Sequence, residues 1–272
     1  MMANQRLIKY GKKSKKIYKF VFEIMINIKT KKEIEIIREG GRIAARILNL
    51  LAEKVKPGIT TNELDIIAAR EIKKANARAS FLGHRDYPAS ICTSINSEVV
   101  HGVPSGRILR DGDIVGLDLG IYHRGFHADT ALTVGAGKID FAKKTLLIVT
   151  KKALDEGISI IRPGIHLGDV QNRIQKIIEG AGFGVVRDLA GHGIGKELQE
   201  MPSIPNFGRQ KTGPVLREGM VLAIEPMVSA GDWHVKILKD GWTVATLDGS
   251  LAAHFEHTLA VTKDGFEVLT QE

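Results

Sequence analysis

The chain has a single cysteine, Cys92, among its 272 residues, and few aromatic side chains, at 6% of the total. One cysteine excludes an internal disulfide and is typical of proteins from a reducing cytosol. No run approaches the roughly 18 apolar residues that a membrane-spanning helix needs. Glycine-rich nucleotide motifs of the G-x-G-x-x-G or P-loop type are also missing. We therefore expect a cytoplasmic protein that does not enter the membrane.

Positive charge is concentrated at the N-terminus. Residues 1–24 hold seven basic side chains and one acidic one, which leaves 32 basic and 30 acidic side chains in the rest of the chain. Because residues 25–272 are nearly neutral, we expect no broad basic surface for binding nucleic acid there. Glu23 interrupts the apolar stretch and no small-residue cleavage site follows, which argues against a signal peptide. We expect residues 1–27 to be a basic extension, disordered or outside a native start at Met25; contact with the ribosome is the alternative.

The sequence contains an internal repeat. The Ile108–Asp118 segment resembles Val215–Glu225 at an offset of 107 residues, and Lys56–Ile59 resembles Arg162–Ile165 at an offset of 106. Both longer segments end an apolar, strand-like run on a carboxylate. We therefore expect residues 28–272 to form one domain with two pseudo-symmetric halves, about 28–137 and 138–272.

Helix and strand patterns recur in the same order in each half. Capping boxes at Thr30–Glu33 and Thr60–Glu63 begin apolar residues at helical spacing. They predict helices over residues 31–55 and from Thr60 to about 75. The second half predicts helices over 140–158 and about 167–180, and strand-like runs fall at 113–121, 126–134, 219–228, 234–238 and 254–262. This pattern favours an α+β fold, with an antiparallel curved sheet backed by two helix pairs.

Two aspartates lie on opposite arms of a predicted hairpin. With a turn centred between His123 and Arg124, Asp118 and Asp129 would face each other, with Cβ atoms about 4.5–5.5 Å apart. Bare carboxylates repel by about 4 kcal/mol at 4 Å for an effective dielectric constant of 20. A cation between them would remove this cost, so the pair indicates a metal site; a solvated hairpin edge is the alternative.

Three more candidate ligands follow along the chain. His192 lies among glycines, Glu225 ends the second repeat, and Glu256 lies on a late strand. Four carboxylates and one imidazole suit two divalent ions (Mn²⁺, Fe²⁺, Co²⁺ or Zn²⁺) better than a thiolate zinc site. Two dications would offset the four negative charges and acidify a bridging water to hydroxide near neutral pH.

These residues resemble those of a known family, the type I methionine aminopeptidases, over about residues 26–270. The resemblance rests on the ordered ligand set and on two local motifs, VHGVP at Val100–Pro104 and GHGIG at Gly191–Gly195. It implies the pita-bread fold, a pseudo-two-fold α+β domain. It also implies a cytosolic, monomeric metallopeptidase with two divalent ions, which hydrolyses the initiator methionine from nascent polypeptide N-termini.

The resemblance also implies a role for each site residue. Asp118 would chelate one ion, Asp129 and Glu256 would bridge both, and His192 and Glu225 would complete the other. A metal-bridging hydroxide would attack the first peptide bond, with Glu225 as the general base. The resemblance further implies that His101 hydrogen-bonds the amide of the second residue.

Several positions depart from the family pattern. Gln199 stands where the family has a second cleft histidine that stabilises the oxyanion, and this change predicts reduced activity. Tyr87, Cys92 and Trp242 match the methionine pocket, whereas Phe81, His84 and Leu198 replace the residues usual in bacterial members. Two alternatives stay open: a peptidase of the same fold with X-Pro specificity, and a weakly active or non-catalytic ribosome-associated binding module.

Overall fold

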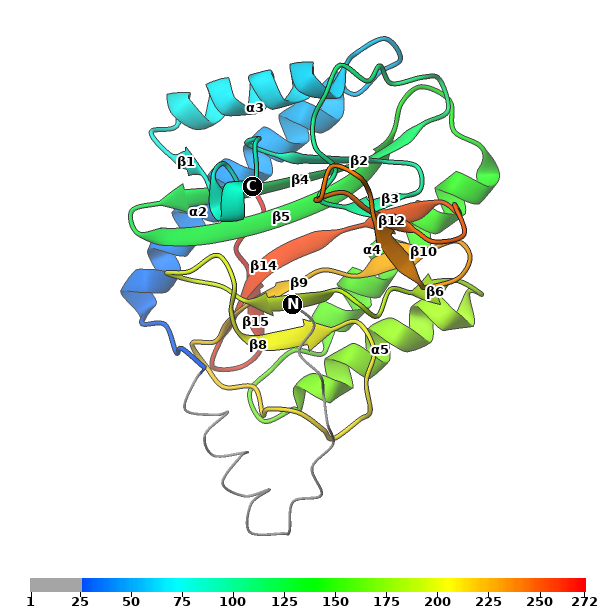
Figure 1. Cartoon of the computed structure of the whole chain (residues 1–272). Coiled ribbons are helices and arrows are strands. Elements are labelled where there is room, and N and C mark those ends of the chain that lie inside the picture. Colours follow the sequence, from blue (N-terminus) through cyan, green and yellow to red (C-terminus); the bar gives the residue numbers. More distant parts are fainter. Residues whose placement is uncertain (1–25) are drawn as a thin grey trace.

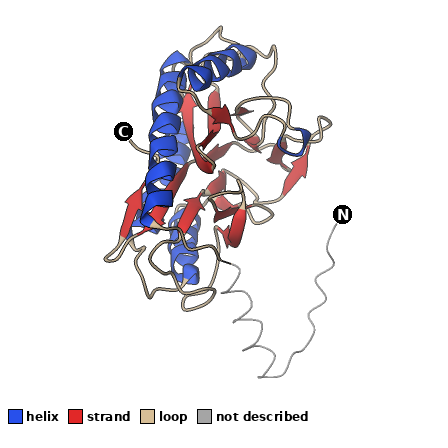
Figure 2. Cartoon of the chain, turned by 90° about the vertical axis from the view of Figure 1, so that its left-hand side faces the viewer, coloured by secondary structure: helices blue, strands red, loops and turns tan. Residues whose placement is uncertain are grey.

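Two pairs of helices cover one face of a curved antiparallel sheet, and shorter strands and loops lie on the side away from the helices (Figures 1 and 2). The structure is a computed structural model that describes residues 26–272. Each helix begins and ends within one residue of its predicted bounds. The helices are α2 (Lys31–Lys54), α3 (Thr61–Lys74), α4 (Phe141–Ser159) and α5 (Leu167–Gly180), with a short 3₁₀ turn η1 (His84–Asp86).

The predicted capping boxes begin α2 and α3. The Thr30 hydroxyl accepts from the backbone N–H of Glu33 at 3.3 Å, and the Glu33 carboxylate accepts from the N–H of Thr30 at 2.8 Å. Thr60 and Glu63 form the same pair of bonds, at 3.1 and 2.7 Å. Because these bonds satisfy N–H groups that lack partners within the helix, both helices start at defined residues.

The main sheet has nine strands in the order β1-β4-β5-β14-β9-β7-β8, with β2 paired to β4 and β15 paired to β14. Two three-stranded sheets, β13-β10-β6 and β11-β12-β3, lie beside it. The main sheet comprises β1 (Arg78–Ala79), β2 (Cys92–Ile95), β4 (Ile114–His123), β5 (Phe126–Gly135), β7 (Ala190–Gly193), β8 (Glu200–Pro205), β9 (Val221–Ile224), β14 (Glu256–Val261) and β15 (Phe266–Val268). The smaller sheets comprise β3 (Glu98–Val100), β6 (Gly184–Val185), β10 (Met227–Ser229), β11 (Val235–Ile237), β12 (Val244–Thr246) and β13 (Ala252–His254).

Each half has the same backbone hydrogen bonds at equivalent positions of the sequence repeat. Gly58 N–H donates to the carbonyl of Leu109 at 2.9 Å, and Leu109 N–H donates to the carbonyl of Ile59 at 2.8 Å. The equivalent bonds of the second half join Gly164 to Leu216 and Leu216 to Ile165, at the same two distances. The sequence repeat therefore corresponds to a repeated local structure.

Separate apolar clusters fill the space between the sheet and each helix pair. In the first half, Leu51 of α2 and Leu64 of α3 pack in one buried cluster with Ile121 of β4. In the second half, α4 and α5 contribute to a larger cluster that also holds β9 and β14 residues. Ile26 is buried in this larger cluster, so contacts with the body begin two residues before the expected boundary at residue 28. Expectations for residues 1–25 lie outside the described residues.

The predicted register of the β4–β5 hairpin is wrong. Asp118 pairs with Ala131 and Asp129 pairs with Gly120, so the two aspartates are diagonal neighbours on one face rather than directly opposite. The turn is centred between Arg124 and Gly125, whose φ angles are 49° and 94°. Two positive φ angles in a two-residue loop are typical of a type I′ turn, and glycine at the second position favours it. This turn chemistry sets the register one residue later than predicted.

Two predicted strands are each divided in the structure. The 219–228 run breaks into β9 and β10 at Glu225–Pro226, and the 254–262 run breaks between β13 and β14 at Phe255. Pro226 has no N–H to give to a ladder, so pairing stops there. At both breaks the chain passes from one sheet to another, with Glu225 and Glu256 beside the breaks.

Among residues 26–272, no helix is long and apolar enough to cross a membrane.

We expect Gly41→Ala to destabilise the fold by about 1–3 kcal/mol. A Cβ at Gly41 of α2 would lie 2.3 Å from the backbone carbonyl oxygen of Leu269, so helix and chain end would have to separate. That end follows β15, which pairs with the Glu256-bearing strand β14. Urea unfolding measures the loss. Gly106→Ala is the control, because its Cβ would meet nothing within 4 Å; equal stability of the two variants would contradict this packing.

Candidate metal centre

The middle strands of the main sheet position the predicted ligands. Asp118 lies on β4 and Asp129 on β5, while β14 begins at Glu256. Glu256 pairs with Ala131, which itself pairs with Asp118, so the three acidic residues lie on neighbouring strands. Paired residues, and residues two apart on one strand, point to the same face of a sheet. The three carboxylates therefore meet on one face, the one opposite the helices.

His192 approaches the same point from β7. Side chains at the neighbouring positions would prevent this, because a Cβ at Gly191 would lie 2.4 Å from the Ala223 carbonyl oxygen and one at Gly193 would lie 2.2 Å from that of Met201. The Nδ1 of His192 lies 3.0 Å from the Gly193 carbonyl oxygen, which can only accept. Nδ1 therefore has the proton, and Nε2 presents a lone pair, as in a metal-ligating histidine.

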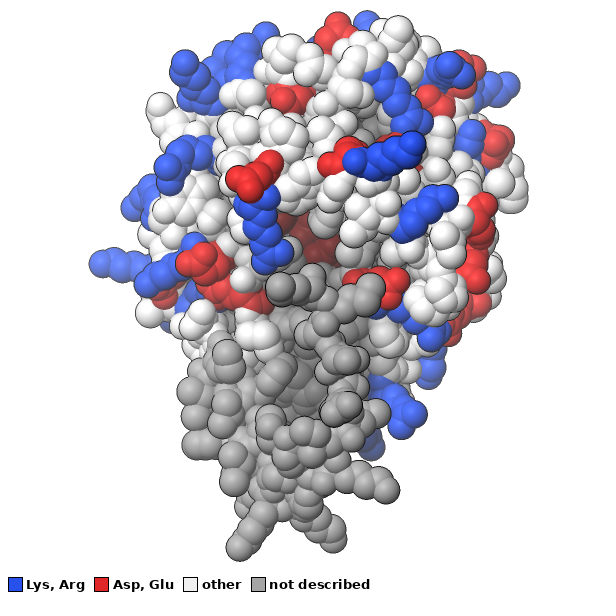
Figure 3. Space-filling model, viewed as in Figure 1, with Lys and Arg blue, Asp and Glu red and all other residues white. Residues whose placement is uncertain are grey.

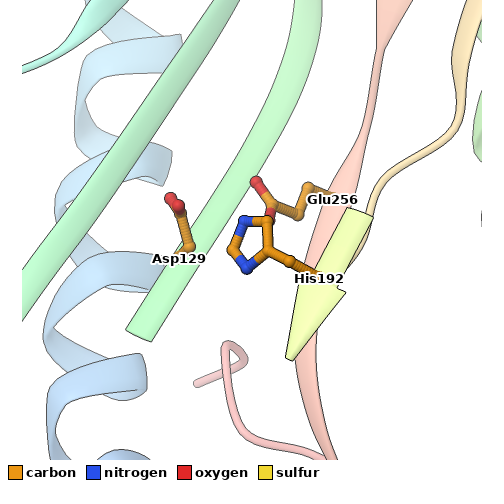
Figure 4. A group of neighbouring side chains, drawn as sticks. All are labelled: Asp129, His192 and Glu256. Carbon is orange, nitrogen blue, oxygen red and sulfur yellow. The ribbon is translucent and has the colours of Figure 1, made fainter. Parts of the chain in front are cut away.

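Three of the predicted ligands form a compact buried group. Asp129, His192 and Glu256 each place one ligand atom within 4.8 Å of the others, and all three are buried (Figure 4). Their side chains converge from β5, β7 and β14 on one point. Glu225 adjoins this group, since its Oε1 lies 3.6 Å from Nε2 of His192.

The carboxylates of this group are costly to hold in the ion-free protein. Burial raises the pKa of Asp129 to about 8, and the negative charge of Glu225 adds to the rise. Burial also raises the pKa of Glu225 to about 7, against an opposing effect of His192. The pKa values of Asp118 and Glu256 lie well above their usual range, mainly through burial and then through repulsion by Asp129.

The donor set fits divalent cations. Within residues 26–272, Oδ1 of Asp118 and Oε1 of Glu256 are buried without a hydrogen-bond partner. Buried oxygens of this kind are costly unless a donor or cation satisfies them. Oxygen atoms with one imidazole nitrogen suit Mn²⁺, Fe²⁺, Co²⁺ or Zn²⁺, as expected from the sequence. The group can therefore hold metal.

We expect Mn²⁺ to stabilise the protein more at about pH 8 than at about pH 5.5. A carboxyl group with a raised folded-state pKa costs nothing below its unfolded pKa near 4. For Asp129 the full cost is present only above about pH 8, so the ion-free protein loses stability as the pH rises between these values. Mn²⁺ offsets that cost and competes with protons at low pH. Thermal unfolding with Mn²⁺ or chelator should differ by several degrees more at the higher pH; equal differences would contradict the assignment.

All the predicted site residues line one cavity of about 150 Å³. In the space-filling view, acidic atoms lie deep in a hollow near the middle of the face (Figure 3). The five predicted metal ligands lie together with the other predicted residues, which are Phe81, His84, Tyr87, Cys92, His101, Leu198, Gln199 and Trp242.

Aromatic rings form an apolar wall beside the acidic group. The Tyr87 ring meets Trp242 edge-on at a centroid distance of 5.2 Å and Phe81 edge-on at 6.4 Å. The Tyr87 hydroxyl donates toward the carbonyls of Ile91, at 3.1 Å, and Gly102, at 3.0 Å. This polar tip is therefore satisfied behind the wall, and the ring is fixed at the cavity.

A comparison with protein-family models also indicates a metalloenzyme. A model described as metallopeptidase family M24 matches residues 35–263, a range that contains every predicted ligand. The chain belongs to the metallopeptidase family M24. The match covers both halves of the sequence repeat, so the family assignment applies to the whole described body.

The M24 relatives of this chain are named methionine aminopeptidases. Methionine aminopeptidase 1 of Bacillus subtilis is 49% identical over 247 residues, which span 91% of this chain and 100% of that protein. The crystal structure of methionine aminopeptidase from Thermotoga maritima superposes with a TM-score of 0.90 at 45% identity, covering 91% of this chain and 100% of that chain. The resemblance to methionine aminopeptidases and the pita-bread fold are confirmed.

A more distant structural likeness concerns the fold alone. Prolidase from Pyrococcus furiosus superposes with a TM-score of 0.73 at 22% identity, covering 97% of this chain and 74% of that chain. At this identity the likeness supports the common architecture and says nothing about specificity.

Some residues in and behind the cavity were not predicted from the sequence. Arg85, in the η1 turn, and Met227 of β10 also line the cavity. His254, the last residue of β13, is 3% exposed and lies behind the cavity, with Nε2 3.5 Å from Oε2 of Glu225. Its one sequence signal was its place two residues before Glu256, which puts both side chains on the same side of an extended chain.

Proposed function

We propose that this chain is a cytosolic dinuclear metalloaminopeptidase that removes the initiator methionine from nascent proteins. The single observation that supports this best is the union of a buried acidic group and an apolar aromatic wall in one cavity. Relatives named methionine aminopeptidase, which this chain matches over 99–100% of their length, support the substrate class.

The donor set would hold two divalent ions in this proposal. Asp118 would hold one ion, His192 and Glu225 would hold the other, and Asp129 and Glu256 would be shared by both. When bound, the ions would polarise the scissile carbonyl and lower the pKa of the attacking water. The unpartnered Oδ1 of Asp118 and Oε1 of Glu256 support this assignment, because both oxygens otherwise lack a donor within the described residues.

The protein side chains would then move the proton and orient the substrate. Glu225 would take a proton from water on its carboxylate and deliver it to the leaving amine, as a general base and then a general acid. His101 would hydrogen-bond the amide of the second residue. Its backbone has a φ of 59°, a conformation that is strained for a non-glycine residue. Such strain is often found where a side chain must be held in one direction.

The apolar wall would bind the methionine side chain. Tyr87, Trp242 and Cys92 would contact the thioether, since sulfur packs favourably near aromatic ring edges. Phe81 and Leu198 are buried at 9% and 5% exposure and complete the wall. His84 lies at its edge and is half-buried. Burial lowers the pKa of His84, which favours the neutral ring beside an apolar ligand.

Partners and location follow from this substrate. Nascent polypeptide N-termini would be the partner, met in the cytoplasm as they leave the ribosome. We expect a monomer, as the resemblance to the small members of the family implies. Ribosome contact through the basic residues 1–24 is a further proposal that lies outside the described residues.

The test is release of methionine from a Met-Ala-Ser peptide by protein reconstituted with Mn²⁺ or Co²⁺. Turnover that chelator abolishes and added metal restores is the expected result. An Ala-Pro peptide serves as the matched substrate for X-Pro specificity. Faster cleavage of that peptide would overturn the methionine assignment. Protein that purifies without metal and has no turnover on either peptide after Mn²⁺ or Co²⁺ is added would favour a binding module.

A further inference from the structure

His254 is buried next to the proposed general base but does not line the cavity. It ends β13, which pairs with β10 so that His254 lies opposite Met227. Met227 follows the Glu225–Pro226 break, and Phe255 N–H lies 3.4 Å from the carbonyl oxygen of Pro226. Both chain breaks therefore lie side by side, and the imidazole of one reaches the carboxylate of the other.

The backbone of His254 is held from both sides by one hydroxyl. Its N–H donates to Oγ1 of Thr133 at 3.0 Å, and that hydroxyl donates to the His254 carbonyl at 2.8 Å. Thr133 lies on β5, the strand that also presents Asp129. The His254 ring is therefore positioned relative to the strand that contributes to the acidic group, not relative to a loop.

One ring nitrogen of His254 has no hydrogen-bond partner among the described residues, and a carboxylate oxygen lies near it. Within residues 26–272, Nε2 of His254 is buried without a hydrogen-bond partner, and the acidic atom near it is Oε2 of Glu225 at 3.5 Å. A small rotation of either side chain closes this gap to hydrogen-bond length, and buried polar atoms are nearly always paired.

The two oxygens of Glu225 then have separate neighbours. Oε1 lies 3.6 Å from Nε2 of His192, on the side of the candidate metal group, and Oε2 lies on the side of His254. A carboxylate held by one oxygen keeps the other in a fixed direction. Groups that orient a metal ligand in this way commonly raise metal affinity and activity by about 10–100-fold.

We propose that His254 is a positioning residue, which donates from Nε2 to Oε2 of Glu225 and so directs Oε1 toward the metal group. This inference rests on the proposed function for its effect on turnover, but its effect on metal binding stands without it. No proton is transferred in this role. The ring acts by hydrogen-bond geometry alone.

The test compares His254→Gln with His254→Leu. The amide nitrogen of Gln can occupy the place of Nε2 and donate, whereas Leu fills the space without a donor. We expect Leu to weaken Mn²⁺ binding, measured by titration calorimetry, by about 10–100-fold and to lower kcat with little change in KM. Gln should stay within about threefold of the wild type in both measurements.

His123→Leu is the matched control, because Nε2 of His123 lies 3.1 Å from Oε2 of Glu39, a histidine–glutamate contact outside the site. It should leave Mn²⁺ affinity unchanged. If His254→Leu does not fold, His254→Asn replaces it, since its shorter amide cannot reach the position of Nε2. Wild-type Mn²⁺ affinity in the donor-free variant, or equal losses in Gln and Leu, would overturn the proposal. Loss of Mn²⁺ affinity in a protein without peptidase activity would sink the proposed function and leave this inference standing.

Discussion

Asp129→Asn is expected to abolish peptidase activity and, in the same protein, to make the ion-free fold more stable. Asp129 is 5% exposed, and its ligand atom lies within 4.8 Å of those of His192 and Glu256. As the proposed bridge between two ions, it would contribute several kcal/mol to charge stabilisation in the transition state. Its loss should lower kcat/KM by about 10³-fold or more, since each 1.36 kcal/mol is a factor of ten.

The gain in stability has a separate physical cause. Burial, and then the negative charge of Glu225, raises the pKa of Asp129 to about 8, so near that pH its charge costs folding energy that the Thr130 N–H offsets only in part. Asn removes the charge and keeps an oxygen that accepts from the Thr130 N–H, a bond of 3.0 Å in the structure. We expect the ion-free variant to gain about 1–3 kcal/mol near pH 8.

Urea unfolding with and without Mn²⁺ separates these effects. The variant should unfold at a higher urea concentration than the wild type with chelator, and Mn²⁺ should add little to it. Asp264→Asn is the control, because Asp264 is exposed on the loop between β14 and β15. It should retain both activity and metal-dependent stabilisation. An ion-free Asp129→Asn protein that is less stable than the wild type would show that the acidic group is not under repulsion.

The helices could be predicted closely because their signals are local. The capping boxes at Thr30 and Thr60 define where α2 and α3 begin, and the spacing of apolar residues defines their length and buried face. Each of these signals involves residues close together in the sequence. The candidate ligands could be named for a related reason. The family resemblance gives each of them its own short motif, although the first signal for Asp118 and Asp129 was the predicted hairpin.

Strand pairing could not be predicted as well, because it depends on turns and on distant partners. The β4–β5 register depends on the positive φ angles of Arg124 and Gly125, and shifting the turn by one residue moved Asp118 two places along its partner strand. The β7 strand around His192 has only four residues and two close-packed glycines, so it has no alternating pattern to recognise.

His254 illustrates a different limit. A single histidine in an apolar segment is most often a satisfied interior residue, and nothing in the sequence names its partner. Its place next to Glu225 comes from the pairing of β10 with β13 and from the Thr133 hydroxyl, 121 positions away in the chain. Contacts that join separate sheets have no signature in either segment alone.

Gln199→His is expected to raise kcat for methionine release by about tenfold or more. Gln199 lines the cavity just before β8 and beside Leu198, where the methionine aminopeptidase pattern has a histidine. We propose that this side chain donates a hydrogen bond to the carbonyl oxygen that becomes negative in the transition state. One well-placed donor of this kind contributes about 10²–10³-fold to kcat, and a neutral amide supplies part of it.

The direction of the change can be tested from both sides. Gln199→Ala removes the donor and should lower kcat by about 10–10²-fold, while KM changes little, because the bond strengthens mainly in the transition state. Gln199→His adds an ionisable ring, so its kcat should acquire a further pH dependence near the ordinary histidine pKa of about 6.5, beyond any that the wild type has. Gln210→His, a substitution at an exposed position outside the cavity, should change neither kcat nor its pH dependence.

Equal kcat values for the wild type, Gln199→Ala and Gln199→His would show that position 199 does not contact the reacting carbonyl in this chain. A gain in the His variant together with a loss in the Ala variant would mean that Gln199 already acts as a weak donor. The protein would then be a working peptidase with reduced oxyanion stabilisation, because the proposed metal ligands lie on β4, β5, β7 and β14 and at Glu225, apart from the residue that precedes β8.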